Sequence, residues 1–369
     1  MRLLKSRAFN TFRYCVYRVI QPKKLRNDNI RDDSLELMSE PTEHITLIWP
    51  NSKQKPRIGL VKDSDYYPYW TKFEKFLRAN NLPFRYYDIH CSDWIDKAVE
   101  LDTIIWRPMS TPSELSEARN KIFFLEHYMH KISYPSFNTL MFYENKILQY
   151  QILSLNRFPV IPTFISNSYM ESINYAKKAS YPVINKVVDS SASTGVERII
   201  NRHHALKTIK ESFSFAGYKT YCPYTRQKDS IYFQNYIPNQ GYDMRIIVIG
   251  DYVFGYYRFI PKGDFRASGM GLVKKSDIPR DAMQLALQIY KCFDAPMLAI
   301  DMLRDNNNKL YVIELSAFVQ VNTPMQLMVN EVPGTYIYNG NDFKFHPGKF
   351  WPQELALKHF LETKYLRSE

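Results

Sequence analysis

The segment that decides the fold runs from residue 242 to residue 323 and opens with Tyr242-Asp243-Met244-Arg245-Ile246-Ile247-Val248-Ile249-Gly250-Asp251-Tyr252-Val253-Phe254-Gly255-Tyr256-Tyr257. Two apolar runs flank the turn dipeptide Gly250-Asp251, so the pattern predicts a β-hairpin. Arginines stand near the ends of this hairpin, at Arg245, Arg258 and Arg266. Guanidinium groups in such places are suited to binding phosphate or carboxylate.

A second pair of strands is predicted at residues 298–303 and 310–315, separated by a polar turn at 304–308. Each strand contains one acid, Asp301 in the first and Glu314 in the second. An ionised carboxylate inside an apolar strand is costly unless a cation meets it. Two carboxylates on paired strands, with arginines nearby, therefore suit a Mg²⁺ ion that bridges the phosphates of a nucleotide.

Composition limits the class of protein. The chain has 369 residues, 45% of them apolar, and can bury two or three modest cores. The formal charge of +12 favours anionic partners such as nucleotide phosphates or an anionic membrane surface. Nucleic acid is not expected, because no recognition module is visible. The four cysteines lie far apart, which argues against a zinc site or disulfide framework and favours the cytoplasm: Cys15, Cys91, Cys222 and Cys292.

Residues 1–56 are predicted to be a basic N-terminal helix followed by a linker. Residues 1–27 contain eight arginines and lysines and no acid, and their apolar residues recur at helical spacing until Pro22. Three interpretations are open: a helix lying on an anionic membrane at its inner face, a helix packed on the protein, or a cleaved transit peptide. A short strand is predicted at residues 45–49, and no stretch is long and apolar enough to span a membrane.

Residues 57–140 alternate between strand and helix patterns. Apolar strands are predicted at residues 58–61, 84–89 and 102–107, with helical segments between them. This alternation predicts a small parallel sheet with covering helices. Gly59 stands alone, so there is no dinucleotide-binding fingerprint, and the segment is expected to supply walls to a site built elsewhere.

The central part of the chain supplies lysines and a loop of small residues. A helix is predicted to begin near Tyr143 and to carry Lys146, and a strand at residues 181–188 carries Lys186. The strand leads into Ser190-Ser191-Ala192-Ser193-Thr194-Gly195, whose backbone N–H groups can approach a phosphate closely. A further strand is predicted at residues 231–238.

Taken in this order, the pieces resemble the ATP-grasp superfamily over residues 57–330. The resemblance is nearest to the branch that holds ribosomal-protein glutamate ligases, glutathione synthetases and D-alanine-D-alanine ligases. It implies an α/β (α+β) ATP-grasp fold, with a small parallel α/β N-terminal domain followed by two α+β subdomains that clamp ATP. The expected divisions are the basic helix and linker at 1–56, the N-terminal α/β domain at 57–140, the central subdomain at 141–225, the C-terminal subdomain with the metal site at 226–335, and an extension at 336–369.

The resemblance also assigns site residues. The ATP-binding residues are expected to be Lys146, Lys186, Ser190, Ser191, Ser193, Thr194, Gly195, Gln234, Asn235, Tyr236, Ile237 and Asp243. Within this set the two lysines reach phosphates, residues 190–195 cover them, and the backbone of 234–237 recognises adenine. The expected catalytic residues are Arg266, which stabilises the transferring phosphoryl group, and Arg245 and Arg258, which position phosphate or carboxylate. The expected metal ligands are Asp301, Glu314 and Ser316.

Two positions depart from the family pattern. The third metal ligand is usually an asparagine, and here that position is Ser316. Three interpretations are open: Ser316 binds the metal directly or through water, Asn322 replaces it, or catalysis is weakened. The adenine-binding segment has Asn235 where the family usually has glutamate.

The function implied is that of an ATP- and Mg²⁺-dependent ligase, with Mn²⁺ as an alternative metal. ATP phosphorylates a substrate carboxylate, and an amine then attacks the acyl phosphate to form a C–N bond, with ADP as a product. The basic helix at residues 1–27, and the resemblance of the run at 264–269 to ATP-grasp chains associated with glycan assembly, suggest an acceptor in surface polysaccharide or peptide synthesis. A non-catalytic nucleotide-binding scaffold and a phosphotransferase of the same fold are the alternatives.

Overall fold

The computed structural model describes residues 42–65, 67–188, 195–220, 225–267 and 272–367. Contacts divide these residues into two compact units. Unit 1 is Ile161–Ile237, and unit 2 combines residues 42–160 with 238–367. The basic helix predicted at residues 1–27 lies outside the described residues. Among the helices that are described, none is long and apolar enough to cross a membrane.

Unit 2 begins with the predicted parallel sheet, whose strand order is β2-β1-β3-β4. Its elements are β1 (Ile58–Leu60), α4 (Trp70–Ala79), β2 (Phe84–Tyr86), α5 (Trp94–Val99), β3 (Thr103–Ile105), α6 (Pro112–His127) and β4 (Ile132–Tyr134). The sequence prediction of a small parallel α/β domain is therefore confirmed. Because the chain passes from β1 to β2 on one side and to β3 and β4 on the other, the loops after β1 and β3 diverge at the strand ends.

The strand predicted at residues 45–49 is wrong. Ile45 and Leu47 are buried, but within the described chain the segment pairs with no strand. Asn80, which follows α4, takes the place of a neighbouring strand. Its Oδ1 accepts a hydrogen bond from the Leu47 N–H (2.7 Å), and its Nδ2 donates to the Ile45 carbonyl (3.1 Å).

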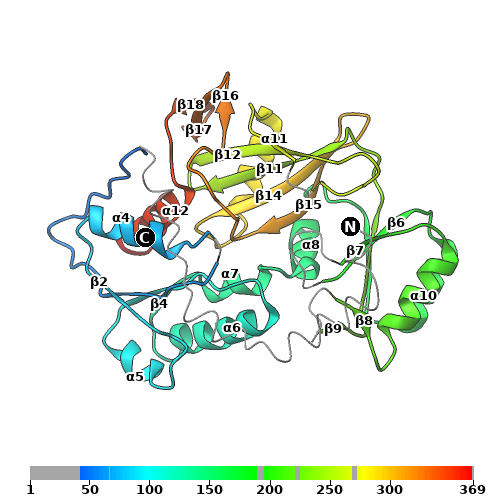
Figure 1. The fold of residues 1–369 in the computed structure, drawn as a ribbon, viewed down its shortest axis with the longest axis horizontal. Helices are drawn as coiled ribbons and strands as arrows, with labels where there is room; N and C mark the ends of the chain where they lie inside the picture. Colours follow the sequence, from blue (N-terminus) through cyan, green and yellow to red (C-terminus); the bar gives the residue numbers. More distant parts are fainter. Residues whose placement is uncertain (1–41, 66, 189–194, 221–224, 268–271, 368–369) are drawn as a thin grey trace. The chain divides into compact units, whose positions relative to one another are not determined.

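The larger sheet of unit 2 is built on the two predicted hairpins, both of which are confirmed (Figure 1). Its strand order is β15-β14-β11-β12-β17-β16, with β13 paired to β12 and β18 to β17. The strands are β11 (Tyr242–Ile249), β12 (Tyr252–Phe259), β13 (Val273–Lys274), β14 (Leu298–Arg304), β15 (Leu310–Ser316), β16 (Met328–Val329), β17 (Val332–Tyr338) and β18 (Phe343–Pro347). The other elements of unit 2 are α7 (Phe137–Phe142), α8 (Lys146–Leu155), α11 (Arg280–Tyr290), α12 (Pro352–Leu361) and the π-helical turn η2 (Glu362–Leu366).

The turn between β11 and β12 requires glycine. Gly250 has φ +56°, and a Cβ atom there would lie 2.7 Å from Nδ1 of His359 on α12. The turn can therefore pack against α12 only without a side chain at this position.

Side chains alternate between the two faces along β11, and its charged residues lie together at one end of one face. Met244, Ile246 and Val248 point to one side and are fully buried. Asp243 and Arg245 point to the other side, at the start of the strand. The sheet thus presents its charged groups at one end of one face.

Unit 1 is a four-stranded sheet of order β5-β10-β6-β7 with two helices. Its elements are β5 (Thr163–Ser166), α9 (Tyr169–Lys178), β6 (Val183–Lys186), β7 (Val196–Ile199), α10 (Arg202–Ser212), β8 (Tyr218–Lys219), β9 (Arg226–Gln227) and β10 (Ile231–Asn235). The sequence-based boundary between residues 225 and 226 falls inside this unit, because β10 pairs antiparallel with both β5 and β6. The segment carrying α8, which was grouped with the central subdomain, belongs to unit 2.

Candidate active site

Two arginines and two aspartates alternate at the charged end of the larger sheet. The strand register places Arg245 opposite Asp301 and Asp243 opposite Arg258. Arg245 binds both oxygens of Asp301 through Nε and Nη2, each at 2.8 Å. Arg258 joins the two aspartates, with Nη2 2.8 Å from Asp301 Oδ2 and Nε 2.6 Å from Asp243 Oδ1. The predicted residues 243, 245, 258 and 301 therefore form one buried network.

The ionisation of this network follows from burial and charge. Burial alone would raise the pKa of Asp301, but Arg245 and Arg258 outweigh it and hold that pKa well below its usual range. Burial raises the pKa of Asp243 and Asp301 adds to the rise, while Arg258 opposes it. Burial would lower the pKa of Arg245, but Asp301 raises it well above its ordinary value. Asp301 is therefore the firmly ionised acid of the network.

The predicted metal ligands lie on the same face of this sheet. Asp301 and Glu314 are directly opposite each other across β14 and β15, and Ser316 is two residues beyond Glu314. The Ser316 hydroxyl donates to the carbonyl of Phe318 (2.5 Å), which leaves its oxygen lone pairs for other ligands. Within the described ranges, no cluster of three or more His, Cys, Asp or Glu could hold a metal. The set of two carboxylates and one hydroxyl nevertheless fits Mg²⁺, which is commonly held by one or two carboxylates with water and phosphate oxygens completing its shell.

Lys146 is held beside Glu314 by the docking of α8 on the sheet edge (Figure 1). Asn145 caps the helix, its side chain accepting from the Leu148 N–H. Gln149 hydrogen-bonds both backbone groups of Leu315, with Nε2 2.9 Å from the carbonyl and Oε1 3.0 Å from the N–H. The Lys146 ammonium consequently lies 3.1 Å from Glu314 Oε1.

Glu144 is a further candidate site residue, which the sequence pattern does not indicate. It is buried, and its backbone φ is +55°. Burial raises the pKa of its carboxyl group to about 7, against the opposing charge of Lys146. Nothing in the local sequence pattern signals this, since the backbone angle and the burial both arise from tertiary packing.

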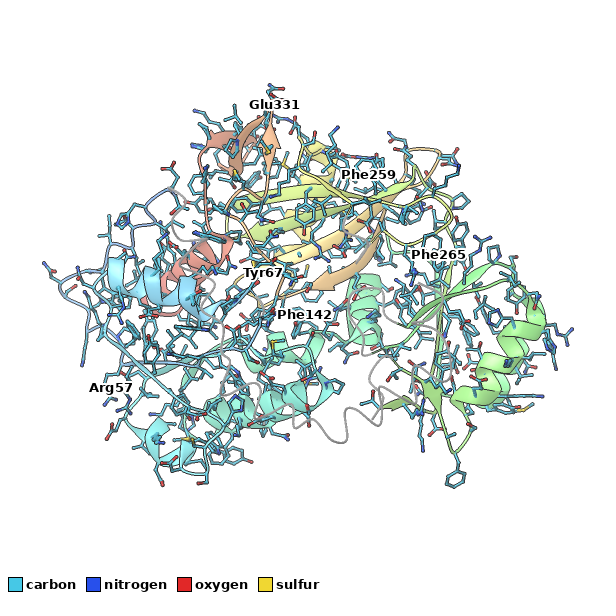
Figure 2. All side chains as sticks on the ribbon, viewed as in Figure 1. Arg57, Tyr67, Phe142, Phe259, Phe265 and Glu331 are labelled. Carbon is cyan, nitrogen blue, oxygen red and sulfur yellow. The ribbon has the colours of Figure 1, made fainter. Side chains whose placement is uncertain are left out.

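Arg107, at the divergence of the loops after β1 and β3, was also missed. Its Nη1 lies 2.5 Å from Asp65 Oδ2, and its guanidinium lies over the rings of Tyr69 (5.2 Å) and Phe318 (5.9 Å). The Tyr69 hydroxyl donates to the Val319 carbonyl (2.6 Å) and accepts from the Val319 N–H (2.9 Å). The segment from β1 to α4, which includes Tyr67 in Figure 2, is thereby fastened to the loop that follows Ser316. The position of Arg107 two residues after the parallel strand β3 is the signal that could identify it.

Arg266 pairs with its own neighbour. Its Nε and Nη2 bind the two oxygens of Asp264 at 3.0 and 2.8 Å, and Asp264 also accepts from the N–H groups of Phe265 and Arg266. The hydrogen bonds from Arg266 hold the pKa of Asp264 well below its usual range. Among the described residues, Arg266 is therefore bound locally and does not join the network around Asp301.

Unit 1 carries the remaining predicted residues that are described. Lys186 and Gln234 are buried on neighbouring strands of its sheet, and the Asn235 N–H donates to the Pro162 carbonyl (2.9 Å). The ring of Tyr236 lies under the guanidinium of Arg198 at 5.2 Å, and Ile237 ends the unit. Gly195 has φ +76° and closes the β6–β7 connection by accepting from the Val187 N–H. Ser190, Ser191, Ser193 and Thr194 lie outside the described residues.

Comparisons with known proteins identify this arrangement. The RimK-like ATP-grasp domain matches residues 143–332. The α-aminoadipate–LysW ligase LysX of Saccharolobus solfataricus is 25% identical over 260 residues, which cover 68% of this chain and 89% of that protein. The coenzyme γ-F420-2:α-L-glutamate ligase of Methanocaldococcus jannaschii is 26% identical over 185 residues, 48% of this chain and 59% of that protein.

Solved structures support the same fold. D-cycloserine synthetase DcsG has a TM-score of 0.55 at 12% identity, covering 84% of this chain and 100% of its own. D-alanine–D-alanine ligase from Bacillus anthracis, complexed with ATP, has a TM-score of 0.50 at 11% identity, covering 71% of this chain and 86% of its own. The likeness in structure is one of fold, and the domain match adds the family. The chain belongs to the RimK-like ATP-grasp family and is an ATP-dependent ligase.

Proposed function

We propose that the protein joins a carboxylate to an amine through an acyl phosphate, using ATP and Mg²⁺. The observation that carries the proposal is the pairing of Asp301 with Glu314 on one face of the sheet, flanked by Arg245, Arg258 and Lys146. This places two carboxylates suited to a metal beside three cations suited to phosphates.

The chemistry proceeds in two displacements. A carboxylate oxygen of the first substrate attacks the γ-phosphorus of ATP, and ADP leaves. The amine nitrogen of the second substrate then attacks the acyl carbon, loses a proton, and inorganic phosphate leaves with the C–O bonding electrons. A bound Mg²⁺ would neutralise charge on the phosphates, and we assign Asp301, Glu314 and Ser316 to hold it.

The cations of the chain stabilise the charge that develops in these steps. Lys146 and Lys186 bind phosphate oxygens, and Arg245 and Arg258 position phosphate or carboxylate. We assign Arg266 to stabilise the transferring phosphoryl group, for which it exchanges its bidentate ion pair with Asp264 for the phosphoryl oxygens. The adenine contacts are assigned to the backbone of residues 234–237, with residues 190–195 over the phosphates.

The substrates are proposed from the relatives' names. α-Aminoadipate and L-glutamate, named for two of them, are both amino acids with an acidic side chain. We therefore propose an amino acid as the amine substrate and the carboxylate of a peptide or small molecule as its partner. An acceptor in surface polysaccharide synthesis stays a prediction that rests on residues 1–27 and 264–269. Its membrane part is wrong if deletion of residues 1–27 leaves membrane association unchanged.

The test is ADP release by the full chain with Mg-ATP, a panel of peptides and small-molecule carboxylic acids as carboxylate substrates, and hydroxylamine as the nucleophile. A ligase yields a hydroxamate in amounts equal to ADP, because hydroxylamine traps the acyl phosphate. Glu314→Gln should lower this rate at least a hundredfold, whereas Glu331→Gln, an exposed matched control (Figure 2), should not change it. A phosphorylated product that hydroxylamine does not trap would establish a phosphotransferase, and no ADP release would favour the scaffold.

A further inference from the structure

Among the buried side-chain atoms of the described chain that have no hydrogen-bond partner are Glu144 Oε2 and Arg107 Nε, which belong to groups of opposite charge. The two residues are 9% and 6% exposed. Buried polar atoms are nearly always hydrogen-bonded, so an acceptor and a donor left over in one place call for a ligand that satisfies both. Arg107 and Glu144 both belong to unit 2, where the ring of Phe318 lies between the guanidinium of Arg107 and the ring of Tyr143, the residue before Glu144.

The backbone of Glu144 supports a role in binding. Eight non-glycine residues of the described chain have positive φ, and Glu144 is the one that is buried, while the other seven are exposed. A left-handed conformation costs a non-glycine residue about 1–3 kcal/mol, and such strain is concentrated at functional sites. A buried, strained and charged residue gives little to stability, which favours a role in binding.

An aromatic wall connects the two side chains. The Arg107 guanidinium lies over the Phe318 ring at 5.9 Å, and Phe318 meets the ring of Tyr143 edge to face at 5.1 Å. Tyr143 directly precedes Glu144. Phe318 also accepts the hydrogen bond from Ser316, so the wall begins at the proposed metal site.

The other cations near Glu144 have carboxylates of their own. Lys146 contacts Glu314, and Arg245 contacts Asp301. Arg107 in turn uses Nη1 for Asp65, which leaves its Nε for another acceptor. The Glu144 carboxylate and the Nε edge of the Arg107 guanidinium are therefore left for a ligand. A small molecule with an ammonium group and a carboxylate is complementary to these two groups.

We propose that Glu144 and Arg107 form the subsite for the amino-acid substrate, with Glu144 binding its α-ammonium group and Arg107 its α-carboxylate. The inference rests on the proposed function, in which that amine attacks the acyl phosphate. Glu144 stands two residues before Lys146, the lysine assigned above to the phosphates. Arg107 lies at the divergence of β1 and β3, the region where open α/β sheets bind ligands.

The experiment measures amino-acid affinity by calorimetry on the full chain saturated with Mg²⁺ and a non-hydrolysable ATP analogue. The panel is the twenty standard amino acids and 2-aminoadipate, and the tightest binder is then compared with its N-acetyl derivative and its α-amide. Glu144→Gln should lower the affinity for the unmodified amino acid at least tenfold. It should not change the affinity for the N-acetyl derivative, which binds more weakly because it lacks the ammonium group. Arg107→Lys keeps a positive charge opposite Asp65. It should lower the affinity for the unmodified amino acid and leave the affinity for its α-amide unchanged.

Matched controls are Glu117→Gln and Arg85→Lys, which alter ion pairs elsewhere in unit 2 and should leave all affinities unchanged. The subsite is refuted if no amino acid binds the wild type, or if the N-acetyl derivative binds as tightly as its parent. The subsite is also refuted if Glu144→Gln lowers the affinities for the amino acid and its N-acetyl derivative by the same factor, because that result would indicate a structural role for Glu144. Hydroxamate formation by the wild type tests the ligase separately, so either claim can fail while the other stands.

Discussion

Asp301 is the residue on which the charged end of the sheet depends. Its carboxylate receives three hydrogen bonds from two buried arginines, and it stands opposite Glu314. Removing one partner of a buried ionic network leaves the others uncompensated, which is more costly than losing the attraction itself.

We predict that Asp301→Asn lowers the free energy of unfolding by about 3–5 kcal/mol, because Arg245 and Arg258 lose their common counter-charge. Urea denaturation followed by circular dichroism measures this. Asp251→Asn, at the exposed turn between β11 and β12, should change stability by less than about 0.5 kcal/mol. A loss from Asp301→Asn as small as that of the control would show that the network contributes nothing.

Asp63 provides a test by pH. Its Oδ2 accepts from the N–H groups of Tyr69 and Trp70 at the start of α4, and burial raises its pKa from 3.8 to about 6 although Arg107 opposes the rise. The folded state then binds this proton more tightly than the unfolded state, so the contribution of Asp63 to stability falls as pH rises from about 4 to about 6.

Asp63→Asn keeps an oxygen acceptor for α4 and removes the titration. The stability of this variant relative to wild type should therefore rise by an amount on the order of 3 kcal/mol between pH 4 and pH 7. Denaturation midpoints at several pH values measure the difference. A difference that is independent of pH, or that falls with pH, would contradict the raised pKa.

The sequence revealed some site residues and concealed others. Asp301 and Glu314 could be proposed from the sequence, because an acid inside an apolar strand is visible there. The structure places them opposite each other, and their role as metal ligands stays a prediction. Glu144 and Arg107 were not, because their significance lies in a backbone angle, in burial, and in contacts with residues far along the chain such as Phe318. The assigned roles of Arg245, Arg258 and Arg266 stay predictions until variants are measured.

At the scale of elements, Gln149 connects α8 to the backbone of the sheet edge. Gln149 satisfies both backbone groups of Leu315 at the edge strand and also donates to the Phe142 carbonyl. An edge strand otherwise leaves such groups without partners.

We predict that Gln149→Leu destabilises the protein by about 2–4 kcal/mol, since buried N–H and carbonyl groups lose their partners. Because α8 carries Lys146, the affinity for Mg-ATP should also fall, by at least threefold. Thermal denaturation and nucleotide titration measure the two effects. Gln288→Leu, on the exposed face of α11, is the control, and equal behaviour of the two variants would contradict the docking role.

Elements with strong local patterns were predicted correctly, and those decided by tertiary partners were not. The hairpins of residues 242–259 and 298–316 follow from apolar runs around polar turns. The apolar run at 45–49 looks like a strand, but a side-chain amide, Asn80, meets its backbone groups instead. The division predicted at residue 225 stays a prediction, and β10, which follows it, pairs with β5 and β6, which lie earlier in the chain.

For the whole molecule, the sequence indicated the family because several weak motifs occur in one order. The comparisons confirm that family and an ATP-dependent ligase. The substrates did not follow from the sequence, because recognition depends on loops such as those after β1 and β3, whose local sequence carries no signature. The proposed amino-acid subsite came from unpaired buried atoms that only the fold brings together.

The measurement that tests the central claim most directly is the thermal midpoint with and without Mg-ATP, for wild type and Glu314→Gln. At a hundredfold excess over Kd, nucleotide binding stabilises the folded state by about 2.7 kcal/mol, which corresponds to a rise of roughly 5 °C for a chain of this size. We predict this rise for wild type and for the exposed control Glu331→Gln, and a rise of less than half that size for Glu314→Gln, which loses a metal ligand and the partner of Lys146. An equal rise in all three proteins, or none in the wild type, would contradict a metal-nucleotide site on β14 and β15.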